Sequence, residues 1–253
     1  MKVSDCLILA AGNGRRMQPL SAGGPKPLAP VCGTPLLEHI ILAAREAGVS
    51  NFHVVVGYRG DLIREYFGQR RLDGVSFDWI ENPDYHQENG ISALTARARL
   101  HEPFLLLMAD HLFQPSTAWA LLQEPISEGE VILAVDRKID SVFDLDDATK
   151  VRREGGKVVD IGKEIPAYDA LDTGMFLCTP ALFDALESAS RNGDGSLSGG
   201  MRELASGRRL RAFDIGEGRW VDVDTPVALT YAERLLECEW QFDLVKGEKT
   251  YAA

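Results

Sequence analysis

The sequence predicts an α/β protein in which helices flank a mixed, mostly parallel β-sheet, with a smaller mixed β/α lobe attached. The first observation is that strand-like and helix-like segments alternate through the first half of the chain. Alternation of this kind implies a parallel sheet with right-handed crossovers. The second observation is that short strands separated by tight turns, one of them at Gly155-Gly156, become frequent beyond residue 130.

The segments of the first half can be justified in order. Residues 6–10 form a continuous apolar run that ends before Gly12 and Gly14, which is typical of a strand buried on both faces. Pro35 then precedes an apolar face at helical spacing in residues 36–44. By the same criteria we expect strands at 53–56, 75–80 and 104–108, and helices at 61–67 and 92–100.

The second half is expected to extend the same domain. Its predicted strands are residues 131–135, 150–153, 157–161, 175–178, 210–214 and 220–224, and its predicted helices are 180–189, 197–205 and 226–239. No repeat and no low-complexity linker separates the halves. We therefore expect one domain over residues 1–239, with a first half 1–111 and a second half 112–239, followed by an apolar tail at 240–253.

Composition and charge exclude several classes of protein. Hydrophobic residues make up 45% and charged residues 26% of the 253-residue chain, as in ordinary globular proteins. A net charge of −11 argues against nucleic acid or anionic lipid as the main partner. The four cysteines are far apart, which is typical of reduced thiols in the cytoplasm. No stretch approaches the roughly 20 apolar residues of a membrane helix, so we expect a cytoplasmic chain without membrane insertion.

A glycine loop after the first strand is the strongest sign of a ligand. Residues 1–33 carry a net charge of +3, whereas the rest of the chain carries −14. Small residues let backbone N–H groups approach an anion, and the nearby cations favour a polyphosphate. The loop is not a Walker A loop, because no Gly-Lys-Ser or Gly-Lys-Thr follows at the required spacing. It is a poor dinucleotide-binding motif, because Met17 stands where the third glycine would be. The remaining alternative is a tight turn without a ligand. The candidate residues are Leu9, Ala10, Ala11, Gly12, Gly14, Arg16 and Lys26.

Three aspartates are candidate ligands of a hard cation such as Mg²⁺. Asp110 follows an apolar strand, at the edge where ligand clefts open in parallel sheets. Asp222 and Asp224 are two residues apart in a short predicted strand, so both side chains should leave by the same face. The alternative is that Asp222 and Asp224 are solvated acids of a turn.

Several blocks together resemble the sugar-nucleotidyltransferase family, which transfers nucleotides from nucleoside triphosphates. The blocks are Leu-Ala-Ala-Gly-x-Gly-x-Arg-Met, Pro-Lys-Pro-Leu at 25–28, Met-Ala-Asp-His at 108–111, Asp-Ile-Gly-Lys at 160–163, Leu-Asp-Thr-Gly-Met-Phe at 171–176 and Trp-Val-Asp-Val-Asp-Thr at 220–225. The last three, with Ala148-Thr149-Lys150 and Asn89-Gly90-x-Ser92, resemble the CTP:inositol-1-phosphate cytidylyltransferase branch. The resemblance implies a Rossmann-like sheet with an acceptor-binding second half.

The resemblance also implies a reaction and a role for each block. CMP would pass from CTP to inositol 1-phosphate, giving CDP-inositol and pyrophosphate. Arg16 would hold the leaving pyrophosphate, Lys26 the α-phosphate and Lys163 the acceptor phosphate, while Mg²⁺ would bind Asp110 and Asp222, with Asp224 as a further candidate ligand. The nucleotide would contact the glycine loop together with Asn89, Gly90 and Ser92, and the acceptor would contact Lys150, Lys163, Asp172, Thr173 and Gly174. His111 is a candidate for supporting Asp110.

Other functions stay open from the sequence alone. The same chemistry could use GTP or UTP, or a sugar, another cyclitol, phosphocholine or a phosphonate as acceptor. A non-catalytic nucleotide-binding module and an NAD oxidoreductase are alternatives of other classes. The tail at 240–253 could pack on the domain, form a homodimer or lead to a partner. The resemblance further implies a functional link to a membrane CDP-alcohol transferase.

Overall fold

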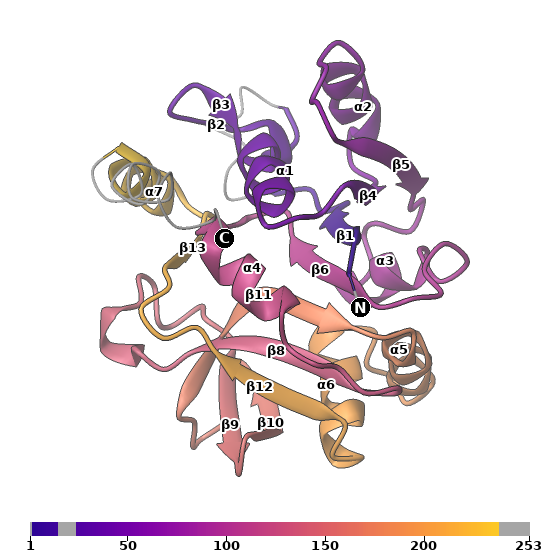
Figure 1. The fold of residues 1–253 in the computed structure, drawn as a ribbon, viewed down its shortest axis with the longest axis vertical. Coiled ribbons are helices and arrows are strands. Elements are labelled where there is room, and N and C mark those ends of the chain that lie inside the picture. Colours follow the sequence, from indigo (N-terminus) through magenta and orange to yellow (C-terminus); the bar gives the residue numbers. More distant parts are fainter. Residues whose placement is uncertain (1, 15–23, 238–253) are drawn as a thin grey trace.

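A nine-stranded mixed sheet runs through both halves of the chain in the computed structural model, which describes residues 2–14 and 24–237 (Figure 1). The strand order is β5-β4-β1-β6-β11-β8-β12-β10-β9. The strands are β1 (Asp5–Ala10), β4 (Asn51–Val56), β5 (Ser76–Glu81), β6 (Phe104–Met108), β8 (Val131–Asp136), β9 (Lys150–Glu154), β10 (Lys157–Gly162), β11 (Ala170–Cys178) and β12 (Leu210–Asp214). Two small sheets pair β2 (Pro30–Val31) with β3 (Thr34–Pro35) and β7 (His111–Phe113) with β13 (Trp220–Asp222).

Parallel pairing is concentrated in the first half of the chain. β5, β4, β1 and β6 are mutually parallel neighbours, as the alternation of strands and helices predicts. β11 then lies antiparallel between β6 and β8. β12 runs parallel to β8, and β10 and β9 complete the sheet in antiparallel fashion. The α/β architecture is confirmed, but the prediction of a mostly parallel sheet is wrong, because antiparallel pairings are as frequent as parallel ones once β11 enters the sheet.

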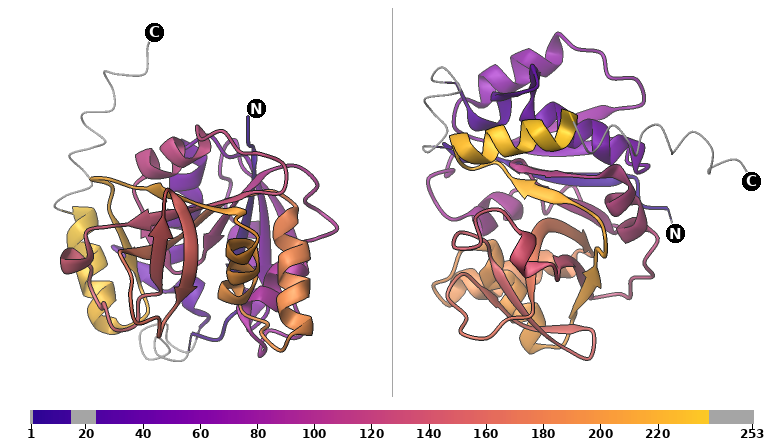
Figure 2. Two further views of the ribbon diagram at one scale, coloured as in Figure 1. Left: turned by 90° about the horizontal axis from the view of Figure 1, so that it is seen from below. Right: turned by 90° about the vertical axis from the view of Figure 1, so that its left-hand side faces the viewer.

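Helices cover both faces of this sheet (Figures 1 and 2). They are α1 (Leu36–Glu46), α2 (Gly60–Gly68), α3 (Asn89–Leu94), α4 (Pro115–Leu122), α5 (Ala181–Arg191), α6 (Leu197–Ser206) and α7 (Pro226–Leu235). Alternate residues of one strand enter different cores: Ile8 packs in the core with α1 and α4, and Leu7 in the core with α5 and α6. This two-sided burial explains why the central strands are continuous apolar runs.

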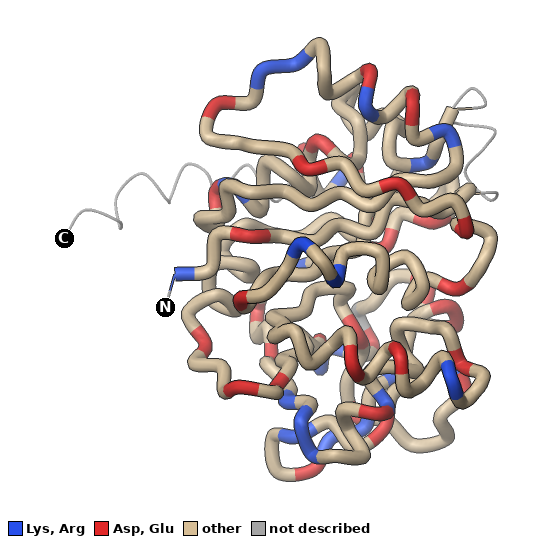
Figure 3. The backbone as a smooth tube through the Cα atoms, turned by 90° about the vertical axis from the view of Figure 1, so that its right-hand side faces the viewer, with Lys and Arg blue, Asp and Glu red and all other residues tan. Residues whose placement is uncertain are grey.

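The last helix returns to the first half of the chain. α7 contacts both β2 and β13, so the two halves are joined beside the small sheets (Figure 2). The Thr225 hydroxyl caps α7 by accepting from the Ala228 N–H at 3.1 Å. Acidic residues are spread over the whole face in Figure 3, with basic residues among them. Within the described residues, no helix combines the length and apolar character that crossing a membrane requires.

Several sequence-based boundaries were wrong. The helix predicted at 92–100 is α3 at Asn89–Leu94, and residues 95–99 continue it only as turns. Glu88 occupies the N-cap position, whereas the Ser92 hydroxyl accepts a hydrogen bond from Asn82 at 2.9 Å and caps nothing. β13 ends at Asp222 and not at residue 224. The short elements β2, β3, β7 and α4 were not predicted, because two or three residues carry no detectable periodicity and α4 lies in an apolar segment without a clear polar face.

The contact between β6 and α5 provides a test of this packing. The rings of Phe104 and Phe183 stack with centroids 5.6 Å apart, and both side chains are fully buried. We expect Phe183→Ala to lower the free energy of unfolding by about 3–5 kcal/mol, since it leaves a cavity between sheet and helix. Phe183→Leu should lose clearly less because it keeps much of the apolar volume. Urea unfolding measures both, and equal losses would contradict the packing described.

Candidate active site

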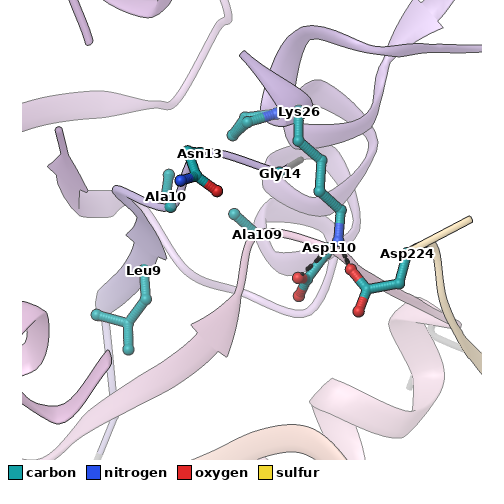
Figure 4. A pocket seen from close by; sticks show the side chains of 10 residues that line it. Leu9, Ala10, Asn13, Gly14, Lys26, Ala109, Asp110 and Asp224 are labelled. Carbon is teal, nitrogen blue, oxygen red and sulfur yellow. Dashed lines mark hydrogen bonds and ion pairs between the residues drawn. The ribbon is translucent and has the colours of Figure 1, made fainter. Parts of the chain in front are cut away.

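A cavity of about 340 Å³ opens at the carboxyl ends of β1 and β6 (Figure 4). This edge of a parallel sheet is where ligands bind in α/β proteins. The described lining comes from the end of β1, the glycine loop, the start of the short helix at Lys26–Leu28, the end of β6 and the segment between β13 and α7. It consists of Leu9, Ala10, Gly12, Asn13, Gly14, Lys26, Pro27, Ala109, Asp110 and Asp224.

Lys26 occupies the middle of the carboxylate group at this cavity. The residue is only 7% exposed, and its Nζ donates to Asp110 Oδ2 at 2.8 Å and pairs with Asp224 (Figure 4). Gly14 crosses directly over the stem of this lysine with a φ of +51°. Any Cβ at position 14 would overlap Lys26 Cβ, so both the positive φ and the close approach require glycine here.

The ion pairs control the protonation of these groups. Burial by itself would lower the pKa of Lys26, but Asp110, Asp224 and Asp222 raise that pKa well above its usual value. Burial would likewise raise the pKa of Asp110, yet Lys26 and His111 hold it far below its usual range. Lys26 is therefore charged and Asp110 is ionised at neutral pH.

A strand pair brings the carboxylates together. β7 and β13 pair antiparallel, with His111 opposite Asp222, and the Val223 N–H donates to the Asp110 carbonyl at 2.9 Å. Asp222 Oδ1 is buried without a hydrogen-bond partner among the described residues. Burial, with the charges of Asp110 and Asp224, raises the pKa of Asp222 to about 7 despite the opposing effect of His111. Among the described residues, the site thus holds more negative charge than its cations balance.

His111 faces this cluster as a donor. Its Nδ1 lies 2.8 Å from Asp110 Oδ1 and 4.0 Å from Asp222 Oδ1. Burial would lower the pKa of His111, but Asp222 and Asp110 together raise it to about 9. A protonated imidazole donates hydrogen bonds, and the 2.8 Å contact makes Asp110 the nearest acceptor of His111.

The carboxylates fit a divalent cation. Ligand atoms of Asp110, His111 and Asp222 lie within 4.8 Å of one another, and so do those of Asp147, Asp222 and Asp224. Carboxylate oxygens are the ligands that hard divalent cations prefer. The unpartnered oxygen of Asp222 and the raised pKa of that carboxyl both indicate a missing positive charge.

A second cavity of about 230 Å³ adjoins the first. Lys163 of this cavity is half-exposed and pairs with Asp147. Burial raises the pKa of Asp172 to about 6, against the opposing effects of the Gly174 N–H and His111. Asp110 and Asp224 line both cavities, so the two spaces meet at the same carboxylates. The described lining is Asn89, Met108, Asp110, His111, Phe143, Asp144, Asp147, Ala148, Thr149, Lys163, Asp172, Gly174, Phe176, Leu197, Ser198, Trp220, Asp222, Asp224 and Ala228.

Most residues predicted from the sequence lie at these cavities. The first contains Leu9, Ala10, Gly12, Gly14 and Lys26, the second contains Asn89, Lys163, Asp172, Gly174 and Asp222, and Asp110 and Asp224 belong to both. Arg16 and the tail at 240–253 lie outside the described residues.

Five predicted residues are absent from the described linings. The Ala11 carbonyl accepts from the Tyr58 N–H at 3.0 Å, and the Thr173 hydroxyl donates to the Ala134 carbonyl at 2.8 Å. Lys150 Nζ donates to the Asp146 carbonyl at 3.0 Å. Gly90 packs against the backbone of residues 195–196, and Ser92 is hydrogen-bonded to Asn82.

Other residues of the second cavity were missed by sequence reasoning. Asp144 and Asp147 stand in the acidic run that precedes β9, where the concentration of acids was the available signal. Ser198 comes from the first turn of α6, and Phe143 stacks on Tyr231 of α7 with centroids 5.0 Å apart. No spacing in the sequence relates these segments to one another.

Comparisons with known proteins identify the family of the chain. Residues 6–207 match the family described as the MobA-like NTP transferase domain. Proteins named "Bifunctional IPC transferase and DIPP synthase" are 40% identical over 90% of this chain in Rubrobacter xylanophilus and 31% over 92% in Aquifex aeolicus. The aligned regions cover 51% and 52% of those proteins, so the chain spans about half the length of the curated relatives it matches.

Solved structures show the same fold. The inositol-1-phosphate CTP transferase from T. maritima superposes with a TM-score of 0.79 and 26% identity, covering 92% of this chain and 97% of that one. A UDP-glucose pyrophosphorylase complexed with UDP-glucose has a TM-score of 0.78 at 21% identity, over 92% and 98% of the two chains. The similarity to the UDP-glucose pyrophosphorylase concerns the fold alone.

The charge balance around Lys26 leads to a prediction about stability. We expect Lys26→Met to destabilise the metal-free protein by about 1–3 kcal/mol, because it leaves partly buried carboxylates without their cation. Added Mg²⁺ should raise the melting temperature of this variant more than that of the wild type. Denaturation with EDTA and with Mg²⁺ measures both effects.

Lys157→Met is the matched control for that experiment. Lys157 Nζ pairs with Glu130 Oε1 at 2.6 Å, and neither residue lines the two cavities as described. The loss should be about 1 kcal/mol, because Arg211 remains 3.7 Å from Glu130, and it should not respond to Mg²⁺. An equal response of the two variants to Mg²⁺ would contradict the role given to Lys26.

Proposed function

The chain belongs to the MobA-like NTP transferase domain family, and from this we propose that it transfers CMP from CTP to inositol 1-phosphate, giving CDP-inositol and pyrophosphate. The choice of nucleotide and acceptor is supported by the names of the T. maritima structure and of the IPC transferase relatives. The observation that carries the proposal is that Asp110 and Asp224 line both cavities. Two substrates in these cavities would meet at one group of carboxylates.

The proposed reaction is a single in-line displacement. An oxygen of the inositol phosphate attacks the α-phosphorus of CTP and forms the new P–O bond. The bond from the α-phosphorus to the bridging oxygen breaks, and pyrophosphate leaves with the electron pair. A phosphate dianion is already a nucleophile at neutral pH, so the protein needs only to position the two phosphates and balance their charge.

The first cavity is proposed to take the triphosphate. The backbone of Gly12 and Gly14 would face the phosphates, and Arg16 would hold the pyrophosphate. Lys26 would exchange its carboxylate partners for the α-phosphate, where negative charge accumulates in the reaction. Asn89, Gly90 and Ser92 would support the nucleotide from the start of α3; the Asn89 Oδ1 accepts from the Leu197 N–H at 2.8 Å, which links α3 to α6.

Mg²⁺ is the proposed cation of the carboxylate group. Asp110 and Asp222 would hold it, with Asp224 as a further candidate ligand. When bound, it would neutralise charge on the α- and β-phosphate oxygens. The fit rests on the donor set and on the unpartnered Asp222 oxygen.

The second cavity is proposed to take the acceptor. Lys163 would bind the acceptor phosphate in place of Asp147, and Asp172 with the Gly174 backbone would contact the ring hydroxyls. Lys150 and Thr173 would act indirectly, through the loop before β9 and the wall beside β8 respectively. In this arrangement residues 112–239 form the acceptor-binding part of a Rossmann-like nucleotidyltransferase domain. A DIPP synthase, the second activity in the relatives' names, is proposed to consume the product.

The proposal predicts a defined pair of substrates. We expect pyrophosphate release in the presence of Mg²⁺ with CTP and inositol 1-phosphate. Crossing the four ribonucleoside triphosphates with inositol 1-phosphate, glucose 1-phosphate and phosphocholine measures this choice. Asp110→Asn is the control for the chemistry and should lose at least about 10²-fold in turnover. Pyrophosphate release with a different pair only would keep the reaction but assign other substrates. No release with any pair would refute the proposal.

A comparison of variants at Lys163 and Lys150 distinguishes loss of acceptor binding from a structural effect. We expect Lys163→Ala to raise the KM for inositol 1-phosphate about 10- to 100-fold, since a hydrogen bond to a charged group contributes about 1.5–3 kcal/mol. The KM for CTP should change far less. Lys150→Ala is the comparison in the same region, and its effect on the acceptor KM should be much smaller. Initial rates at varied acceptor concentration decide, and a larger effect of Lys150→Ala would reverse the assignment.

A further inference from the structure

Asp136 is a buried carboxylate that lies outside both cavities as described. It ends β8 and is only 2% exposed. One oxygen, Oδ2, accepts from Trp220 Nε1 at 3.0 Å. The other oxygen, Oδ1, lies 2.8 Å from both the backbone nitrogen and Nζ of Lys138. Both carboxylate oxygens are thus satisfied, and the orientation of the Trp220 indole is fixed by one of them.

Trp220 lies against the ring of His111. The two rings are stacked with centroids 5.6 Å apart and an angle of 8° between their planes. On β11, Gly174 approaches the imidazole so closely that a Cβ there would lie 2.6 Å from His111 Cδ2. The positive φ of Gly174, +74°, allows this approach. Between the indole and the glycine backbone, the imidazole has little room to turn.

The imidazole in turn holds Asp110. Its Nδ1 lies 2.8 Å from Asp110 Oδ1, while Lys26 Nζ donates to the other oxygen of the same carboxylate. The plane of the Asp110 carboxylate is therefore defined by one contact on each oxygen. Partners behind a metal ligand commonly set its orientation, and their loss typically costs about 10- to 100-fold in metal affinity or activity.

We propose that Asp136 is a positioning residue: through Trp220 it fixes the plane of His111, and through His111 it fixes the orientation of the Asp110 carboxylate. The inference rests on the proposed function in one respect, since it takes Asp110 as a ligand of the divalent cation. Asp136 itself touches neither the cation nor a substrate. Trp220 also packs against the core, so metal affinity must be measured beside stability to separate positioning from support of the fold.

Mn²⁺ binding to the metal-free protein tests the proposal without any turnover. We expect Asp136→Leu to raise the Mn²⁺ dissociation constant, measured by electron paramagnetic resonance of free Mn²⁺, about 10- to 100-fold. Asp136→Asn keeps an oxygen that can accept from Trp220 Nε1 and should recover most of the affinity. In turnover, kcat should fall by a similar factor in Asp136→Leu, with smaller changes in the KM for CTP and for the acceptor.

Trp220→Phe tests the same step from the other partner. It keeps an aromatic ring beside His111 but removes the N–H, so its loss of Mn²⁺ affinity should resemble that of Asp136→Leu. The double variant should lose little more than either single variant, because both break one hydrogen bond. Additive losses would overturn the proposal. If Asp136→Leu does not fold, Trp220→Phe decides alone, and a wild-type dissociation constant in it overturns the proposal.

Glu38→Leu is the matched control for burial. Glu38 is 6% exposed in α1, and its Oε2 accepts from the Tyr66 hydroxyl at 2.5 Å. This variant should lower the melting temperature while leaving the Mn²⁺ dissociation constant unchanged. If Glu38→Leu and Asp136→Leu weaken Mn²⁺ binding equally, Asp136 supports the fold only, and the proposal is overturned.

The two proposals fail in different ways. Wild-type protein that binds Mn²⁺ but releases no pyrophosphate with any substrate pair refutes the proposed reaction, and the Mn²⁺ affinities of the variants still decide the role of Asp136. Wild-type protein that binds no Mn²⁺ overturns the positioning role directly.

Discussion

Negative charge withdrawn from water requires positive charge nearby, and this requirement governs the centre of the molecule. Asp110, Asp222 and Asp224 gather at one sheet edge, where Lys26 and His111 are the cations that face them within residues 2–14 and 24–237. Two unit charges at 4 Å interact by about 4 kcal/mol at an effective dielectric of about 20, so each missing partner is costly. The deficit is visible at Asp222, whose pKa is raised and whose Oδ1 has no partner among the described residues. Such a deficit of positive charge favours the binding of a cation among these carboxylates.

These three neighbouring carboxylates can be held together only by a rigid part of the fold. Lys26 is 84 residues from Asp110 and 198 from Asp224 along the chain. The strands that carry Asp110 and the glycine loop are neighbours, and each is buried on both faces. The pairing of β7 with β13 then sets Asp222 beside Asp110. Apolar burial on both faces of the sheet therefore supplies the free energy that keeps like charges close together.

The predictable part of this structure is the part that is local in sequence. Apolar runs such as residues 6–10 and 104–108 identify their strands, because two-sided burial leaves a continuous hydrophobic pattern. The glycine loop and Asp110 could be proposed as a site because each follows such a run. The limits of α3 could not be predicted. A serine such as Ser92 often marks the start of a helix, but here α3 begins at Asn89 and the Ser92 hydroxyl accepts from Asn82.

The contacts between distant segments were beyond sequence reasoning. The β7–β13 pair joins three-residue strands, which have no periodicity of their own. Asp136 is an unremarkable strand-end acid in the sequence, and only the tertiary fold brings it to Trp220. Asp147 likewise becomes a neighbour of Lys163 and Asp222 through the course of the loop before β9. Charged groups at a site thus depend on packing that local patterns do not encode.

The charges of the second cavity bear on which acceptor suits it. Its described lining includes six aspartates and one lysine, Lys163, together with His111. A single phosphate group can pair with Lys163, whereas additional anionic groups would face carboxylates and be repelled. Ring hydroxyls can donate hydrogen bonds to those same carboxylates. When a phosphate takes Lys163 from Asp147, the released carboxylate lies within reach of Asp222 and Asp224 and adds negative charge there. Acceptor binding would then strengthen the demand for a divalent cation, so charge balance couples the two cavities through the carboxylates they share.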